Sequence, residues 1–224
     1  MKKTKKTKMR LSDKPDIDKI QEMLAMAEKD NLSIRDLREA VNQYKRRQQD
    51  EIRLYNEPEK FAIILADPAW EYDFSRSDSR QIDNQYLPTP LEDMKRLKLP
   101  AADDCVLFMW ATSPKLPEAI ELMEAWGFEY KTGMVWVKDK IGMGYYARQK
   151  HELLLIGTKG NLQLPDEDKR PESVIVAPRT GHSEKPEIVH EIIETMYPTY
   201  KKLEMFARKA REGWEVWGDE AHYK

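Results

Sequence analysis

Six apolar residues in succession, Phe61 to Ala66, stand immediately before Asp67-Pro68-Ala69-Trp70. An apolar run without polar alternation is typical of a strand that is covered on both faces, as the strands of parallel sheets are. Such a sheet needs helices on both faces, so the run favours an α/β domain. Polar residues that follow such a strand lie at the edge where open α/β sheets bind ligands. The tetrapeptide is therefore the first candidate site.

The chain after this run alternates short apolar strands with helical stretches, which favours a mostly parallel sheet. We expect strands near 61–66, 105–111, 133–138, 152–157, 173–176, 202–207 and 214–217. We expect helices at 90–97, 115–126 and 185–197. Two long polar segments, 72–86 and 139–151, flank the candidate site. Segments of this length in a compact domain are usually functional or disordered, and we expect these two to close over the substrate.

The tetrapeptide resembles the Asp-Pro-Pro-aromatic signature of methyltransferases that act on exocyclic amino groups, with Ala69 in place of the second proline. The lone pair of such an amine is delocalised into its ring. A carboxylate that accepts one N–H, and a proline carbonyl that accepts the other, would make the nitrogen more pyramidal. Trp70 would stack on the base, a contact worth about 1–3 kcal/mol. The alternative is a strand that ends in a proline turn with an anchoring tryptophan, because four residues can match by accident.

Further segments match in order and at similar spacing, so that residues 61–220 resemble a family of adenine N(6)-methyltransferases. The family is typified by the catalytic subunit of the eukaryotic messenger-RNA adenosine methyltransferase and has phage and bacterial members. The segments are 104–112 (DCVLFMWAT), 126–128 (WGF), 135–138 (VWVK), 152–161 (ELLLIGTKGN), 182–186 (HSEKP), 202–208 (KLEMFAR) and Trp214. The resemblance implies a permuted, Rossmann-like methyltransferase domain over 58–224, with the catalytic tetrapeptide before the segments that bind S-adenosylmethionine.

The resemblance also implies site residues. The tetrapeptide Asp67, Pro68, Ala69 and Trp70 would be catalytic. The donor would be bound by Ala66, Asp67, Lys185, Glu204, Phe206, Arg208, Asp219 and Glu220. Lys185 would begin a helix and pair with the donor carboxylate, and Glu204 would accept from donor hydroxyls. Tyr86, Arg148 and Glu152 would contact the substrate.

Three departures from the family bear on individual contacts. Ala207 replaces a glycine, Ala210-Arg211 stand in place of a His-Asn pair, and Gly218-Asp219-Glu220 in place of Gly-Asn-Gln. Ala69 makes the catalytic loop less rigid. Because Asp67 and Trp70 are both retained, we favour an active enzyme over a non-catalytic, nucleic-acid-binding subunit.

We expect direct methyl transfer to the adenine amino nitrogen, most simply in DNA, with no covalent enzyme intermediate and no metal. A target base in duplex DNA would have to be flipped out. RNA adenosine is the alternative substrate, and methylation of cytosine or glutamine amino groups is a further one. The tryptophan that closes the tetrapeptide argues against that last option.

Charge is distributed unevenly. Residues 1–56 carry 15 Lys and Arg against 10 Asp and Glu, whereas the remainder carries 23 against 30. Residues 1–12 are predicted to be a basic arm that contacts phosphates, although a solvated tail is equally consistent. Residues 13–57 are predicted to form two helices, the second exposing Arg35 and Arg38. This extension either reads DNA as a helix-turn-helix or packs on the catalytic domain or a partner, as a homodimer or with another subunit.

One cysteine, Cys105, excludes an internal disulfide framework and a cysteine-based zinc cage. No apolar stretch approaches the roughly 20 residues of a membrane span, and the N-terminus lacks the apolar core of a signal peptide. We therefore expect a cytoplasmic protein that does not contact membranes.

Overall fold

The structure is a computed structural model, and it divides the chain into two compact units, Met1–Arg53 and Leu54–Lys224. It describes residues 59–70 and 89–218 except 143, 145, 182 and 183, together with scattered positions between 21 and 45. The predicted arm, residues 1–12, lies outside the described residues, as does most of the predicted extension and the segment 72–86. The described positions of the first unit are helical except Ser33, and Arg38 among them is exposed.

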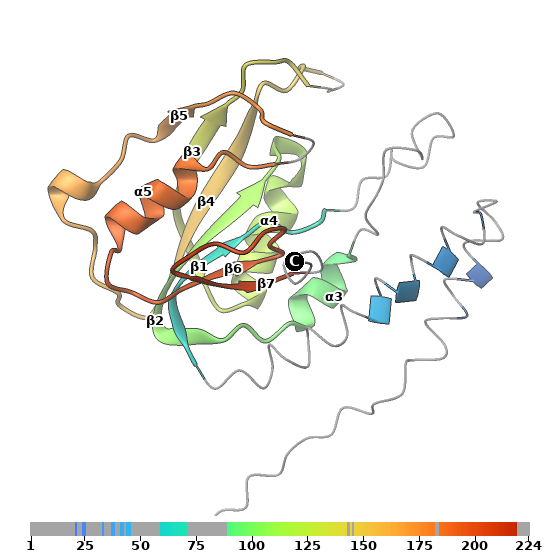
Figure 1. The fold of residues 1–224 in the computed structure, drawn as a ribbon, viewed down its shortest axis with the longest axis horizontal. Coiled ribbons are helices and arrows are strands. Elements are labelled where there is room, and N and C mark those ends of the chain that lie inside the picture. The colour runs from blue at the N-terminus through green and yellow to red at the C-terminus, as the bar shows by residue number, and fades with distance from the viewer. Residues whose placement is uncertain are drawn as a thin grey trace, which may run out of the picture. The chain divides into compact units, whose positions relative to one another are not determined.

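Seven strands form one sheet in the described part of the second unit (Figure 1). Their order is β5-β3-β4-β2-β1-β6-β7. The strands are β1 Phe61–Ala66, β2 Ala101–Ala111, β3 Glu129–Val137, β4 His151–Lys159, β5 Val174–Val176, β6 Lys202–Met205 and β7 Trp214–Trp217. Every pairing is parallel except the two of β4, which runs against β2 and β3. The expected mostly parallel α/β sheet is confirmed.

Helices cover both faces of the sheet (Figure 1). The helices α3, Leu91–Arg96, and α4, Leu116–Ala125, lie over one face, and α5, Ile188–Met196, lies over the other. Short 3₁₀ turns occur at η3, Ser113–Lys115, and η4, Glu167–Lys169. No helix of the described residues has the length and apolarity needed to cross a membrane.

Alternate residues of the central strands supply two separate cores. Ile64 of β1 and Leu107 of β2 join the core under α3 and α4, whereas Ile63 and Phe108 join the core under α5. This explains why these strands are apolar at nearly every position, since both of their faces are buried. Cys105 is fully buried in the first core.

The strand directions bring one set of chain ends together. The carboxyl ends of β1, β2, β3 and β6 and the amino end of β4 meet at the same edge of the sheet, because β4 alone is reversed. Asp67 follows β1, and Glu152 is the second residue of β4. Residues that are 85 positions apart in the chain are thereby placed at one edge.

Several predicted boundaries differ from the observed ones. The strands β2 and β3 begin at Ala101 and Glu129, earlier than the predicted 105 and 133, and β4 ends at Lys159, later than the predicted 157. Two further boundaries near the candidate site are wrong, each for a local reason. The helix expected from residue 185 begins at Ile188, with Glu187 as its N-cap. Lys185 precedes a proline, which disfavours the helical conformation at Lys185. The strand expected over 202–207 ends at Met205, because Phe206 adopts a left-handed backbone with φ of 62°. Lys185 therefore lies just before α5 and not in its first turn.

Candidate active site

Four charged side chains of alternating sign form a chain of ion pairs at the carboxyl edge of the sheet. Lys185 Nζ lies 2.6 Å from Asp67 Oδ2 and 3.6 Å from Glu152 Oε2. Lys138, directly after β3, donates to Glu152 Oε1. Sequence reasoning predicted Asp67, Glu152 and Lys185 as site residues, and the structure brings all three together. Sequence reasoning missed Lys138, although the family-like segment 135–138 ends in this lysine.

Burial changes the acid–base character of this chain. Asp67 is 27% exposed and Lys185 16%. Burial raises the pKa of Asp67, and the opposing effect of Lys185 does not cancel this. Burial would lower the pKa of Lys185, but Asp67 and then Glu152 outweigh it, so that the Lys185 pKa is raised. Lys185 therefore stays cationic, while Asp67 is a carboxylate with increased affinity for a proton or an N–H donor.

Three tryptophans lie at this edge, and the rings of two of them contact the lysines. The Trp110 and Trp136 rings meet edge to face at 6.0 Å. Lys185 Nζ lies 5.6 Å from the Trp110 ring centroid, and Lys138 Nζ lies 4.8 Å from that of Trp136. Trp70 donates its indole N–H to the Trp110 carbonyl at 3.2 Å, which holds its partly buried ring in one orientation. Cation–π contacts of this kind help to stabilise the two lysines among apolar neighbours.

Backbone hydrogen bonds fix the tetrapeptide despite the alanine at its third position. The Asp67 N–H donates to the Met205 carbonyl at 3.3 Å, and the Trp70 N–H donates to the Pro68 carbonyl at 2.9 Å. The Thr89 N–H donates to the Ala69 carbonyl at 3.2 Å. A carbonyl oxygen has two lone pairs, so the Pro68 carbonyl can accept a second N–H. These bonds restrain the loop where a second proline would have stiffened it.

The end of β6 carries the other predicted donor-binding residues. His190 Nε2 of α5 lies 3.0 Å from Glu204 Oε2. The Phe206 ring packs edge to face on Trp217 at 5.1 Å, and its left-handed backbone is a strained conformation of the kind found at functional sites. Arg208 lies close enough to act electrostatically on Asp67 and Lys185.

Gly218 explains how the backbone can approach closely at this turn although alanine stands at position 207. The Ala207 N–H donates to the Trp217 carbonyl at 3.0 Å, and Ala207 is buried. A Cβ on Gly218 would lie 2.3 Å from the Ala207 carbonyl oxygen. The close backbone approach at this turn is therefore made possible by the glycine at 218, with a methyl group accommodated at 207.

The described contacts do not connect the remaining predicted residues to the chain of ion pairs. Ala66 is buried at the end of β1, as its role in the sheet requires, and Arg148 is exposed between β3 and β4. Arg38 belongs to the first unit. Tyr86, Arg35, Asp219 and Glu220 lie outside the described residues. Among the residues that are described, no three His, Cys, Asp or Glu side chains gather as a metal site.

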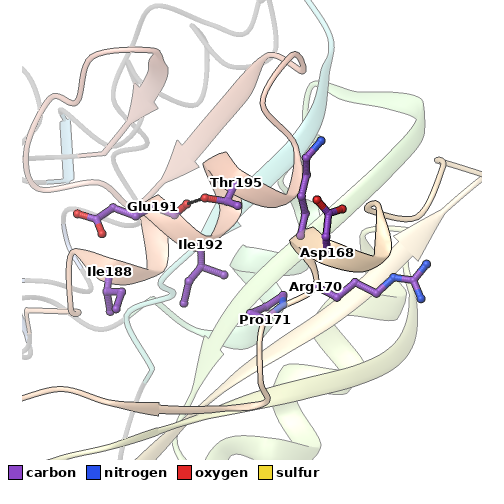
Figure 2. A pocket seen from close by; sticks show the side chains of 8 residues that line it. Asp168, Arg170, Pro171, Ile188, Glu191, Ile192 and Thr195 are labelled. Atoms are coloured by element: carbon purple, nitrogen blue, oxygen red, sulfur yellow. Dashed lines mark hydrogen bonds between the residues drawn. The ribbon is translucent and has the colours of Figure 1, made fainter.

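A cavity of about 300 Å³ lies elsewhere, between α5 and the segment that includes η4 (Figure 2). Its lining includes Arg170 and Pro171 on one side and Ile188, Ile192 and Thr195 on the other. No residue predicted for the site lines it. The carboxyl edge, which combines the paired charges, the tryptophans and the strained turn, is the candidate active site.

The part of the chain that forms this edge is similar to known proteins. The profile of the MT-A70 family matches residues 61–220. The type II methyltransferase M.MunI of a Mycoplasma species is 34% identical over 179 residues, which is 71% of this chain and 77% of that protein. The human N(6)-adenosine-methyltransferase catalytic subunit METTL3 is 30% identical over 158 residues, 66% of this chain. An MT-A70-like N(6)-adenosine-methyltransferase of Arabidopsis thaliana is 28% identical over 172 residues. The chain spans about a quarter of the length of these last two relatives.

Proposed function

Because the chain belongs to the MT-A70 family, we propose that it transfers a methyl group from S-adenosylmethionine to the exocyclic amino group of adenine in DNA. The observation that carries the proposal is the Asp67 carboxylate at the end of the central strand, ion-paired with Lys185 and next to the anchored Trp70. DNA is favoured over RNA because the chain matches most of a type II methyltransferase and only a quarter of METTL3. RNA adenosine is the second candidate, supported by the similarity to METTL3.

The protein groups suit the chemistry of an aromatic amine. The Asp67 carboxylate accepts one N–H of the amine, and the second lone pair of the Pro68 carbonyl accepts the other. Trp70 stacks on the base after it has been flipped out, which offsets part of the few kcal/mol that flipping costs. The nitrogen must lose a proton when it gains a methyl group, and the raised pKa of Asp67 suits its carboxylate to receive that proton.

The residues at the edge also fit S-adenosylmethionine, which supplies a methyl group activated by a sulfonium. Lys185 provides a cation for its carboxylate, and Glu204 provides an acceptor for its ribose hydroxyls. Arg208 adds positive charge next to Asp67. The indole N–H of Trp217, beside Phe206, is buried without a protein partner among the described residues, and it offers a donor to an acceptor on the ligand. Tyr86, Asp219 and Glu220 are proposed to complete the site.

Binding of the donor would change the state of Asp67. In the structure Lys185 Nζ donates a hydrogen bond to Asp67 Oδ2. A carboxylate on the ligand competes with Asp67 for the same ammonium group, and Asp67 is then left to accept from the adenine amine. The proposal therefore includes an order of binding in which S-adenosylmethionine precedes the target base.

DNA affinity is proposed to come from positive charge outside this edge. The basic arm over 1–12, the helical extension over 13–57 with Arg35 and Arg38, and Arg148 between β3 and β4 would contact phosphates. Each phosphate contact steepens the dependence of log affinity on log salt by roughly 0.9 on duplex DNA. Removal of residues 1–12 is expected to lower this slope while leaving the affinity for S-adenosylmethionine unchanged.

The test is transfer of tritiated methyl from S-adenosylmethionine to duplex DNA, single-stranded DNA and RNA, followed by nucleoside analysis. The native chain is compared with Asp67→Ala and with Asp168→Ala, an exposed aspartate beside the separate cavity. We expect N(6)-methyladenine in DNA from the native chain and from Asp168→Ala, but not from Asp67→Ala. Absence of transfer to all three substrates, with no calorimetric binding of S-adenosylmethionine, would identify a non-catalytic, nucleic-acid-binding subunit.

A further inference from the structure

A buried histidine outside the ion-pair chain bonds the carboxylate at the end of β6. His190 is 11% exposed on its side chain and Glu204 is 19% exposed. Their side chains meet because Glu204 is aligned with Leu65 of β1, whose side chain lies on the face that α5 covers. The 3.0 Å contact between His190 Nε2 and Glu204 Oε2 joins α5 to the strand next to β1. This contact is not part of the chemistry proposed for Asp67.

The surroundings of the second ring nitrogen, Nδ1, indicate which group donates the hydrogen bond between His190 and Glu204. His190 Nδ1 is buried and has no hydrogen-bond partner among the described residues. A proton on that nitrogen would be a buried donor without an acceptor, which costs more than a bare lone pair. The proton of the neutral ring therefore belongs on Nε2, where it is donated to Glu204. His190 is the donor of this bond, and the Glu204 carboxylate is the acceptor.

The ring of His190 is itself held in place. It meets the Trp214 ring edge to face, with centroids 5.2 Å apart. The Trp214 indole N–H donates to Glu194 Oε1 at 2.7 Å, and Arg211 Nε donates to the same carboxylate at 2.8 Å. Glu194 lies one helical turn after His190 on α5. The histidine therefore presents its Nε2–H to Glu204 from a restrained position. A donor held in this way can keep the carboxylate that it contacts in one orientation.

Glu204 occupies a place where nucleosides are recognised in open α/β sheets. It stands at the carboxyl end of β6, beside the strand that leads to Asp67. Ligands bind outside the carboxyl ends of such strands, and an acidic side chain there commonly accepts from ribose hydroxyls. A carboxylate has several lone pairs, so one bond from His190 leaves it able to accept from a hydroxyl.

We propose that His190 is a positioning residue for the methyl donor, holding the Glu204 carboxylate in the orientation that accepts the ribose hydroxyls of S-adenosylmethionine. The inference rests on the proposed function, because it requires that this edge bind that donor. The inference extends the proposed function by assigning the recognition of two parts of the ligand to one segment of the chain. Lys185, just before α5, serves the carboxylate, and His190, within α5, serves the ribose through Glu204.

The experiment measures the dissociation constant of S-adenosylhomocysteine, the stable product of the donor, by calorimetry on the full chain. His190→Phe keeps an aromatic ring against Trp214 but removes the donor. His190→Gln restores an N–H near the position of Nε2, whereas the shorter amide of His190→Asn does not reach it. Ile193→Val is the matched control, because it loosens the same helix at a buried position and leaves both His190 and Glu204 unchanged.

We expect His190→Phe and His190→Asn to weaken S-adenosylhomocysteine binding about 10-fold, the loss typical of one hydrogen bond to a charged group. His190→Gln and Ile193→Val should bind within about 2-fold of the native chain. The native chain should bind an analogue of S-adenosylhomocysteine that lacks both ribose hydroxyls more weakly than S-adenosylhomocysteine itself. His190→Phe should bind this analogue as tightly as the native chain does. The double variant His190→Phe/Glu204→Gln should bind no more weakly than Glu204→Gln alone.

If His190→Phe weakened the binding of S-adenosylhomocysteine and of the analogue without hydroxyls by the same factor, the positioning role would be overturned and a purely structural one would remain. Native-like binding by His190→Phe and His190→Asn would also overturn it. If His190→Phe does not fold, the comparison of the two amide variants decides, since both place a polar group in the same site. Absence of S-adenosylhomocysteine binding by the native chain would instead refute the proposed function on which the inference depends.

Discussion

The buried ion pair between Lys185 and Asp67 gives the sharpest prediction about stability. Lys185→Met removes the ammonium while keeping a side chain of similar length against Trp110. Breaking a buried pair from one side costs about 3–5 kcal/mol, and the partial exposure of both groups lets water screen part of that cost. Glu152 also keeps Lys138 as a partner. We expect a loss of about 2 kcal/mol of unfolding free energy, or a Tm lowered by about 4–8 °C.

The loss should depend on pH in a defined direction. The pKa of Asp67 is already raised in the folded chain, and Lys185 is the main group that holds it down. Its removal raises the folded-state pKa further, so the ionised carboxylate destabilises the variant at neutral pH. As the pH falls through that raised pKa, Asp67 takes up a proton and the cost of the unpaired charge disappears. The difference between native and variant should therefore be full near pH 7 and shrink toward acid pH.

Urea unfolding at a series of pH values measures this difference, with Lys209→Met as the control. Lys209 also pairs with a glutamate, Glu184, but its side chain is 72% exposed. Its removal should change stability little at any pH. In the background of Asp67→Asn, Lys185→Met should cost much less than in the native chain. A loss for Lys185→Met that is independent of pH and unchanged by Asp67→Asn would refute the coupling inferred from the structure.

Three further predictions follow from the site and its surroundings. Glu152→Gln removes a negative charge that raises the pKa of Asp67, so the acid limb of the pH–rate profile should move to lower pH; a shift to higher pH would contradict this electrostatic account. Trp70→Ala should raise KM for duplex DNA by roughly 5- to 150-fold through lost stacking of about 1–3 kcal/mol, with the Kd for S-adenosylhomocysteine near the native value; equal loss of both would indicate a collapsed site. Burial raises the pKa of the Cys105 thiol to about 12, so iodoacetamide should label it at pH 8 only after unfolding in urea, and rapid labelling of the folded chain would show that this core opens.

Local sequence patterns predicted most of the scaffold. The uninterrupted apolar run at 61–66 identified a strand buried on both faces, and its bounds in the structure are the same. The Trp214–Trp217 strand was also predicted with its observed ends. The first strand is recognisable because burial on both faces leaves it no polar positions, whereas the second keeps one exposed polar residue, Glu215. The start of α5 and the end of β6 were misplaced, because they depend on the conformation of single residues at Lys185 and Phe206.

The sequence by itself determined which chemical groups are available. A carboxylate after a buried strand, a tryptophan three residues later and a family-like order of segments were enough to predict Asp67, Glu152 and Lys185 as site residues. Sequence separation hides which of these groups touch, since strand pairing and the reversal of β4 bring them together.

Only the tertiary structure decided the pairings. It showed that Lys185 donates to Asp67 and approaches Glu152, that Lys138 completes the ion-pair chain, and that His190 Nε2 lies 3.0 Å from Glu204 Oε2. It also assigned the close approach at the end of β6 to Gly218. These facts depend on desolvation and on distances of a few ångströms between strands and helices, and neither quantity is encoded in any short stretch of the chain.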